Sequence, residues 1–198
     1  EAKGHGAPTA TTHEAAESVA PAKALQWLKN GNTRYVTARL RRDGQGVGDR
    51  QRLTAGQHPH TIVLSCSDSR VPPELVFDQK LGEIFVVRTA GESLDNAAIG
   101  SIEYAVEHLG AKLIVVMGHE SCGAVKAALG TIKGGDAGSP ALNALVADMH
   151  PRLKSFEDKT PSAGYISEAA ANAAAVKADL LKRSKIVSEA QEKNGLVI

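Results

Sequence analysis

Four side chains able to bind a soft metal ion stand in two short segments of the sequence. Cys66 and Asp68 lie two residues apart, and His119 and Cys122 follow about fifty residues later. The chain has two cysteines, and each segment contains one of them. Two thiolates, an imidazole and a carboxylate complete a tetrahedral zinc site, and sulfur with imidazole favours zinc over magnesium or calcium. The sequence therefore predicts one Zn²⁺ per chain, held by these four residues.

An apolar run precedes each segment and predicts a buried strand. Residues 61–64 lead to Cys66, and residues 113–117 lead to His119. Such continuous runs are typical of parallel sheets, in which ligands gather beyond the carboxyl ends of the strands. We expect an α/β fold, with a mainly parallel β-sheet flanked by helices and an N-terminal helical arm. Two strand ends would then bring the four groups to one crevice.

Each pair of residues alone would also fit an ordinary structural role. Buried cysteines are commonly inert core residues, and a single histidine is usually structural. Two pairs at two strand ends, using every cysteine of the chain, favour the metal site. Arg70 adds to this, because its cation can pair with the Asp68 carboxylate when the metal does not.

Three longer motifs resemble the β-class carbonic anhydrases. They are residues 65–72 (Ser-Cys-Ser-Asp-Ser-Arg-Val-Pro), residues 82–88 (Gly-Glu-Ile-Phe-Val-Val-Arg) and residues 118–123 (Gly-His-Glu-Ser-Cys-Gly). The resemblance runs in order from about Leu25 to the C-terminus. It implies a zinc enzyme that reversibly hydrates carbon dioxide to bicarbonate and a proton by attack of zinc-bound hydroxide. It also implies a homodimer or tetramer with the active site near the subunit interface.

The same resemblance gives Asp68 and Arg70 catalytic roles. Catalytic zinc needs an open coordination position, so Cys66, His119 and Cys122 would hold the metal while Asp68 pairs with Arg70. Asp68 would then accept a hydrogen bond from the nucleophile. If Asp68 bound the metal instead, no coordination position would remain for the nucleophile. We expect higher pH to favour the arrangement in which Asp68 pairs with Arg70.

Four residues are expected to surround the substrate. Gln57, nine residues before the first cysteine, matches a glutamine that reaches the substrate in the β class. Phe85 and Tyr104 match aromatic positions of the substrate cleft. Gly123 lets the backbone approach the metal crevice. Without the resemblance, Phe85 and Tyr104 would be ordinary core aromatics and Gln57 a surface residue.

The composition limits the partners. The net charge of +1 implies no nucleic acid and no anionic membrane surface. No apolar run approaches the roughly 18 residues that span a bilayer. The cysteines stand beside metal-ligand partners, so no disulfide is expected. The expected partners are carbon dioxide, bicarbonate and further copies of the chain.

The domain organisation follows from composition and from the ends of the sequence. Residues 1–20 are rich in Ala, Thr, Gly and Glu without apolar periodicity, which predicts a flexible N-terminal arm. Residues 21–198 form a single β-carbonic anhydrase-like domain, with an apparently incomplete strand starting at Leu196. The first residue is Glu1 rather than Met, which favours a periplasmic or otherwise exported protein over a cytoplasmic one.

Local signals place the helices and loops. Pro21 opens a helix, Asp95 caps another, and residues 165–193 predict a long, alanine-rich helical stretch. The remaining expectations concern three short segments: Ser121 caps a helix, residues 39–42 are a solvated helix end, and residues 44–48 are a flexible loop.

Three other functions remain open from the sequence. A β-class scaffold that hydrolyses carbon disulfide or carbonyl sulfide would have the same zinc site and a different access channel. A non-catalytic protein with a closed structural zinc site would explain four ligands but not Arg70. A thiol redox protein would use Cys66 and Cys122, although it would lack the usual Cys-x-x-Cys pair.

Overall fold

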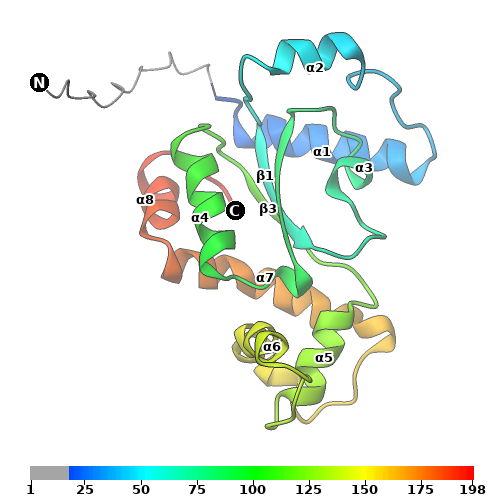
Figure 1. Ribbon diagram of the computed structural model, residues 1–198, viewed down its shortest axis with the longest axis vertical. Coiled ribbons are helices and arrows are strands. Elements are labelled where there is room, and N and C mark those ends of the chain that lie inside the picture. Colours follow the sequence, from blue (N-terminus) through cyan, green and yellow to red (C-terminus); the bar gives the residue numbers. More distant parts are fainter. Residues whose placement is uncertain (1–17) are drawn as a thin grey trace, which may run out of the picture.

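The core of the fold is a three-stranded parallel sheet (Figure 1). The structure, a computed structural model, describes residues 18–198, so the predicted flexible arm lies almost entirely outside the described residues. The central strand β1 (Thr61–Cys66) pairs in parallel with β2 (Ile84–Thr89) on one side and β3 (Ile114–Met117) on the other. This confirms the predicted α/β fold with a mainly parallel sheet.

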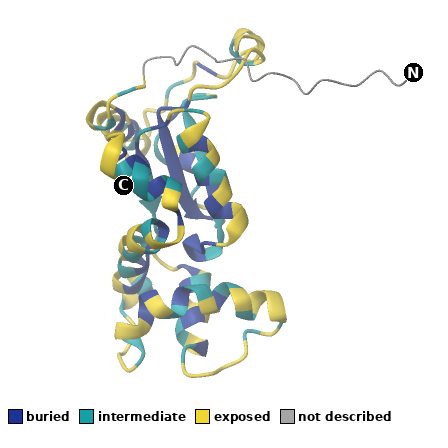
Figure 2. Cartoon of the chain, turned by 90° about the vertical axis from the view of Figure 1, so that its left-hand side faces the viewer, coloured by how far each residue is buried: buried dark blue, intermediate teal, exposed yellow. Residues whose placement is uncertain are grey.

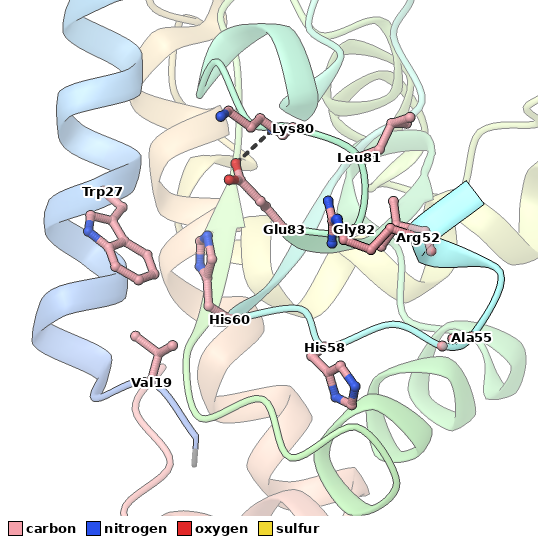
Figure 3. Close-up of a pocket in the computed structure, with 12 residues that line it drawn as sticks. Val19, Trp27, Arg52, Ala55, His58, His60, Lys80, Leu81, Gly82 and Glu83 are labelled. Carbon is pink, nitrogen blue, oxygen red and sulfur yellow. Dashed lines mark hydrogen bonds between the residues drawn. The ribbon is translucent and has the colours of Figure 1, made fainter. Parts of the chain in front are cut away.

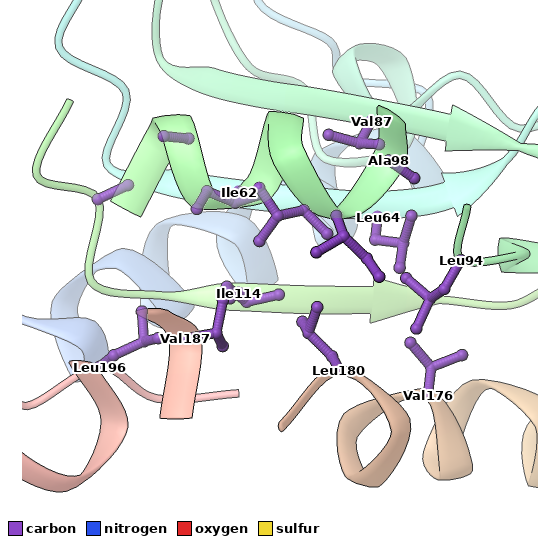
Figure 4. Close-up of a cluster of buried hydrophobic side chains, with 14 of the residues drawn as sticks. Ile62, Leu64, Val87, Leu94, Ala98, Ile114, Val176, Leu180, Val187 and Leu196 are labelled. Atoms are coloured by element: carbon purple, nitrogen blue, oxygen red, sulfur yellow. The ribbon is translucent and has the colours of Figure 1, made fainter. Parts of the chain in front are cut away.

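Helices flank the sheet on both faces. The side chains of α4, α7 and α8 pack with Ile62, Leu64 and Ile114 on one face (Figure 4). On the other face, α1 places Ala24 and Leu28 against Leu113. The described helices are α1 (Pro21–Val36), α2 (Val47–Leu53), α3 (Pro73–Val76), α4 (Asn96–Glu107), α5 (Gly123–Thr131), α6 (Pro140–Leu153), α7 (Ile166–Arg183) and α8 (Lys185–Lys193).

All six residues of β1 are buried, because this strand has a neighbour on each edge and helices on each face (Figure 2). Alternate side chains of a strand point to opposite faces. Ile62 and Leu64 therefore face α4 and α7, and residues 62–64 form a continuous apolar run within the strand. This explains why the sequence of β1 is recognisable without its partners.

A second apolar cluster lies beyond the carboxyl ends of the strands. Helices α5 and α6 pack on each other and on α7, at the bottom of the view in Figure 1. The cluster combines Val125, Met149 and Leu153 with both cysteines, Cys66 and Cys122. The two thiols are thus buried by helices that follow the sheet in the sequence.

Several local expectations are confirmed. Pro21 is the first residue of α1, and the Asp95 side chain accepts a hydrogen bond from Ala98 N at 2.7 Å, capping α4. At the C-terminus, a single parallel bridge between Leu113 and Val197 extends the sheet beside β3.

The long helical stretch predicted over residues 165–193 is present, but as two helices, α7 and α8, rather than one. Ser184 has an extended backbone (φ −118°, ψ 109°) and separates α7 from α8. Its Oγ accepts a hydrogen bond from Val187 N at 3.1 Å, which caps α8, and donates to Glu103 Oε1 at 2.7 Å. This buried pairing with α4 turns the chain, and an alanine-rich composition gives no sign of it.

Two surface segments also differ from expectation. The glycine-rich residues 44–48 are not wholly loop, because α2 begins at Val47. Arg41 is not a solvated helix end: α1 ends at Val36, and the Arg41 guanidinium lies 3.0 Å from Glu83 and also contacts Asp78. Among the described helices, none is long and apolar enough to span a membrane.

The core packing predicts the effect of truncating a leucine. Leu180 of α7 is fully buried, whereas Leu142 of α6 is 50% exposed. We expect Leu180→Ala to lower the free energy of unfolding by about 3 kcal/mol, since it leaves a cavity. Leu142→Ala, the matched control, should change it by less than about 0.5 kcal/mol. Urea denaturation of both variants measures this, and equal losses would contradict the described core.

Candidate metal centre

Three of the four predicted ligands meet at the carboxyl edge of the sheet. Cys66 is the last residue of β1, His119 follows β3 by two residues, and Cys122 immediately precedes α5. Their ligand atoms lie within 4.8 Å of one another. The two sulfur atoms are 3.9 Å apart, close to the spacing of about 3.8 Å that two thiolates adopt on a tetrahedral zinc ion.

The His119 ring is oriented as a metal ligand. Its Nδ1 lies 2.8 Å from the Glu120 carbonyl oxygen, so Nδ1 carries the proton and Nε2 offers a lone pair. Nε2 is buried and has no hydrogen-bond partner among the described residues. A buried nitrogen left unpaired is costly, and a metal ion beside the two thiols would satisfy it.

The two thiols form a hydrogen bond with each other, and Cys66 also accepts one from the backbone. Gly91 N donates to Cys66 Sγ at 3.3 Å. The pKa of Cys66 is lowered, chiefly because the Cys122 thiol donates to its sulfur. The pKa of Cys122 is raised by the same contact and by burial, because a second negative charge would lie beside the first. The pair therefore loses one proton readily, and a cation would favour loss of the second.

Asp68 forms an ion pair with Arg70 and does not belong to the metal-binding group of Cys66, His119 and Cys122. Arg70 Nε and Nη2 donate to the two carboxylate oxygens at 2.8 and 2.7 Å, and Arg70 N donates to Oδ1 at 2.9 Å. These hydrogen bonds hold the pKa of Asp68 well below its usual range. Asp68 Oδ2 nevertheless remains 3.8 Å from His119 Nε2. The carboxylate is thus ionised and adjacent to the metal group without belonging to it.

The loop between His119 and Cys122 is held from two sides. Ser121 has a left-handed backbone (φ 55°), its N–H donates to the Gly164 carbonyl oxygen, and its own carbonyl oxygen accepts from Arg70 Nη2 at 3.2 Å. The prediction that Ser121 caps α5 is wrong, because Cys122 occupies the capping position. Arg70 therefore contacts both Asp68 and the loop that carries two of the ligands.

Of the four residues expected at the substrate, only Gly123 lies beside the metal group, as the first residue of α5. Phe85 pairs with Ile62, four residues before Cys66 and so about 13 Å away along the strand. The Phe85 and Tyr104 ring centroids are 6.4 Å apart. Tyr104 and Gln57 line a hollow of about 440 Å³. Within one chain, this group stands apart from the metal-binding group.

A second hollow, of about 410 Å³, lies between α1, α2 and the segments leading into β1 and β2 (Figure 3). Trp27 and His60 form one wall, with ring centroids 5.0 Å apart. Glu83 is held by Lys80 N, which donates to Glu83 Oε2 at 2.7 Å. This hollow contains none of the residues that the sequence assigned to the site.

Three residues near the metal group were missed from the sequence: Gly91, Glu92 and Asn172. Glu92 is 1% exposed, and its Oε2 accepts from Asn172 Nδ2 at 3.0 Å. Burial raises the pKa of Glu92 to about 7, and the Cys66 charge acts in the same direction. An acidic residue after a glycine suggests a surface turn, and nothing in the pattern of α7 distinguishes Asn172 from a surface residue.

Comparison with known proteins identifies the family. The protein-family model described as carbonic anhydrase matches residues 61–198. Carbonic anhydrase 2 of Mycobacterium tuberculosis is 53% identical over 115 residues, which cover 58% of this chain and 56% of that protein. The carbonic anhydrase of Mycolicibacterium smegmatis is 47% identical over 133 residues, covering 67% of this chain and 65% of that protein.

The fold agrees with this match. A tetrameric β-carbonic anhydrase of Sordaria macrospora superposes with a TM-score of 0.66 at 23% identity, covering 88% of both chains. The chain therefore belongs to the carbonic anhydrase family, and its fold is that of this β-class structure. It spans only 56% and 65% of the lengths of the two mycobacterial relatives.

Burial of Glu92 predicts a specific pH dependence of stability. Its pKa is about 7 in the folded chain against an ordinary 4.5, so the folded state retains a proton that the unfolded state releases. Stability contributed by that proton is present at low pH and is lost as pH rises towards 7. Relative to Glu92→Gln, we expect the unfolding free energy of the unaltered, metal-free chain to fall by roughly 2 kcal/mol between about pH 5 and pH 8.

Urea denaturation at both pH values measures this difference. The matched control is Glu107→Gln, the same chemical change at an exposed position of α4, for which the difference should not vary with pH. A difference for Glu92→Gln that is equally constant would contradict a buried, proton-retaining Glu92.

Proposed function

We propose that this chain catalyses the reversible hydration of carbon dioxide to bicarbonate and a proton, with one Zn²⁺ held by Cys66, His119 and Cys122. The observation that carries the proposal is the buried, unpartnered His119 Nε2 beside two thiols, with Asp68 held on Arg70. Membership of the carbonic anhydrase family supports the same reaction.

Bound zinc would lower the pKa of a water molecule towards ~7 and so supply a nucleophile at neutral pH. The protein has to orient that water. Asp68 remains ionised because of Arg70, so its carboxylate can accept a hydrogen bond from the attacking water and direct a lone pair towards carbon dioxide. Because Arg70 donates to both of its oxygens, the Asp68 carboxylate would stay off the bound metal.

The alternatives from the sequence have less support. A closed structural zinc site would need Asp68 as the fourth ligand, whereas both Asp68 oxygens accept hydrogen bonds from Arg70. A thiol redox protein needs a cysteine that its partner can reach, but both cysteines are buried, beside an imidazole nitrogen that has no hydrogen-bond partner among the described residues. Hydrolysis of carbon disulfide or carbonyl sulfide would use the same site, and no feature of its geometry favours these substrates over carbon dioxide.

We further propose that the active enzyme contains at least two copies of the chain. Gln57, Phe85 and Tyr104 would line the substrate cleft by family resemblance, yet they lie towards the opposite end of the sheet from Cys66 in the same chain. Tyr104 is 48% exposed and thus available to a neighbouring copy. The similar protein from Sordaria macrospora is described as tetrameric, which agrees with a site completed between subunits.

The first test measures carbon dioxide hydration against metal content. In stopped-flow assays with a pH indicator, we expect the rate to rise in proportion to bound zinc, up to one ion per chain. His119→Ala should lose both tight zinc binding and activity, because it removes the only imidazole of the metal group. A chain fully loaded with zinc but without hydration activity would overturn the proposed reaction.

The role of Asp68 has its own test. Asp68→Asn should retain zinc but lose roughly 100-fold in kcat, since the amide cannot replace the charged acceptor. Asp158→Asn is the matched control, because Asp158 pairs with Lys133 on the surface, with its side chain 83% exposed. Zinc content and stopped-flow rates measure both effects. An Asp68→Asn variant as active as the control would remove Asp68 from the mechanism.

A further inference from the structure

The turn after β2 brings a backbone donor to the first metal-binding thiol. Gly91 N donates to Cys66 Sγ at 3.3 Å. Gly91 (φ 65°) and Glu92 (φ 53°) both have left-handed backbone conformations. Such a conformation is unfavourable for a residue with a side chain, so it persists only where the surroundings enforce it. Contacts outside the turn must therefore hold it in place.

Helices α5 and α6 confine the turn closely. A Cβ atom at Gly91 would lie 2.5 Å from Met149 Sδ and 2.9 Å from Ala124 Cβ. Only glycine fits here, for reasons of space as well as of backbone conformation. This packing limits where Gly91 can lie, but apolar contacts do not orient its peptide groups.

Asn172 of α7 supplies the orientation. It is fully buried, and its Nδ2 donates to the Gly91 carbonyl oxygen at 2.9 Å and to Glu92 Oε2 at 3.0 Å. Its Oδ1 accepts from Arg152 Nε at 2.9 Å. The carboxamide thus joins both left-handed residues of the turn to a buried guanidinium, with its oxygen and nitrogen fixed by different partners.

Arg152 in turn anchors the carboxamide to α6 and α7. Its side chain is 2% exposed and lies 2.9 Å from Asp148 and 2.7 Å from Asp179. Asp148 Oδ2 also accepts from Leu94 N at 2.8 Å, just after the turn. A shift of Asn172 would therefore break a connected set of buried hydrogen bonds rather than one.

We propose that Asn172 is a positioning residue for the metal site, locking the Gly91–Glu92 turn so that the Gly91 N–H remains on the Cys66 sulfur. The inference rests on the proposed metal site and does not depend on carbon dioxide as the substrate. A hydrogen bond to a thiolate stabilises its charge and reduces electron donation to the metal. Loss of such outer partners typically weakens metal binding by 10- to 100-fold.

The unaltered chain offers the most direct test. With ¹¹³Cd²⁺ bound in place of zinc, an N–H···S hydrogen bond to a ligating sulfur transmits scalar coupling between the amide proton and the metal. We expect the Gly91 amide proton to couple to ¹¹³Cd in NMR spectra. A loaded chain with no such coupling overturns this inference alone, whereas a chain that binds neither Cd²⁺ nor Zn²⁺ overturns the proposed function as well.

Asn172→Asp then tests the carboxamide itself. The aspartate keeps the size and the acceptor for Arg152 but loses both donors to the turn. We expect the Gly91 coupling to vanish, zinc affinity by chelator competition to fall 10- to 100-fold, and the thiolate-to-metal absorption band of the Co²⁺ form to move to lower energy. Asn143→Asp, the same change at a partly exposed site in α6, should leave all three unchanged.

A buried apolar control separates positioning from general destabilisation. Val176→Ala, also in α7 and fully buried, should lower stability without altering zinc affinity or the Co²⁺ band. Equal losses of affinity in Val176→Ala and Asn172→Asp would overturn the proposal, as would an Asn172→Asp variant indistinguishable from the unaltered chain. If Asn172→Asp does not fold, Asn172→Ala, which removes both donors without adding a charge, is judged by the same criteria.

Discussion

The parallel pairing of β1 with β3 is the constraint on which the site depends. It brings the carboxyl ends of two strands to one edge of the sheet, so Cys66 and His119 lie together although 53 positions separate them. A single helix start, at Cys122, then completes the group. Because side chains alternate along a strand, a register shift of one residue would turn Cys66 to the other face of the sheet. Cys66 would then no longer lie beside His119 and Cys122.

The surroundings of this edge are unusually polar for a buried region. Glu92, Asn172 and Arg152 are all buried, and each would be costly without partners. They are instead joined in one network that ends on Asp148 and Asp179. Such a network holds specific orientations that apolar packing alone would leave free. In this chain, it connects α6 and α7 to the backbone that faces the first thiol.

The two ends of the sheet have different roles. The carboxyl end carries the thiols, the imidazole and the Asp68–Arg70 pair, whereas the aromatic residues expected at the substrate lie back towards the other end. The ion pair with Arg70 holds the Asp68 carboxylate outside the metal group, and the Tyr104 side chain is half exposed. In the proposed enzyme, one chain would supply the metal-binding side chains and a second chain would supply walls of the substrate cleft.

The sheet and the meeting of Cys66, His119 and Cys122 can be predicted from the sequence alone. The apolar runs before Cys66 and His119 predict buried parallel strands, and the carboxyl ends of such strands lie at one edge whatever the details of packing. Other features follow only from the packing of the whole chain. It placed Asp68 on Arg70, separated α7 from α8 at Ser184, and brought Asn172 to Gly91 across 81 residues. The Ser184–Glu103 and Asn172–Gly91 contacts each join residues 81 positions apart, and Asp68 has two possible partners, Arg70 and the metal group, so none of these outcomes leaves a periodic pattern in the sequence.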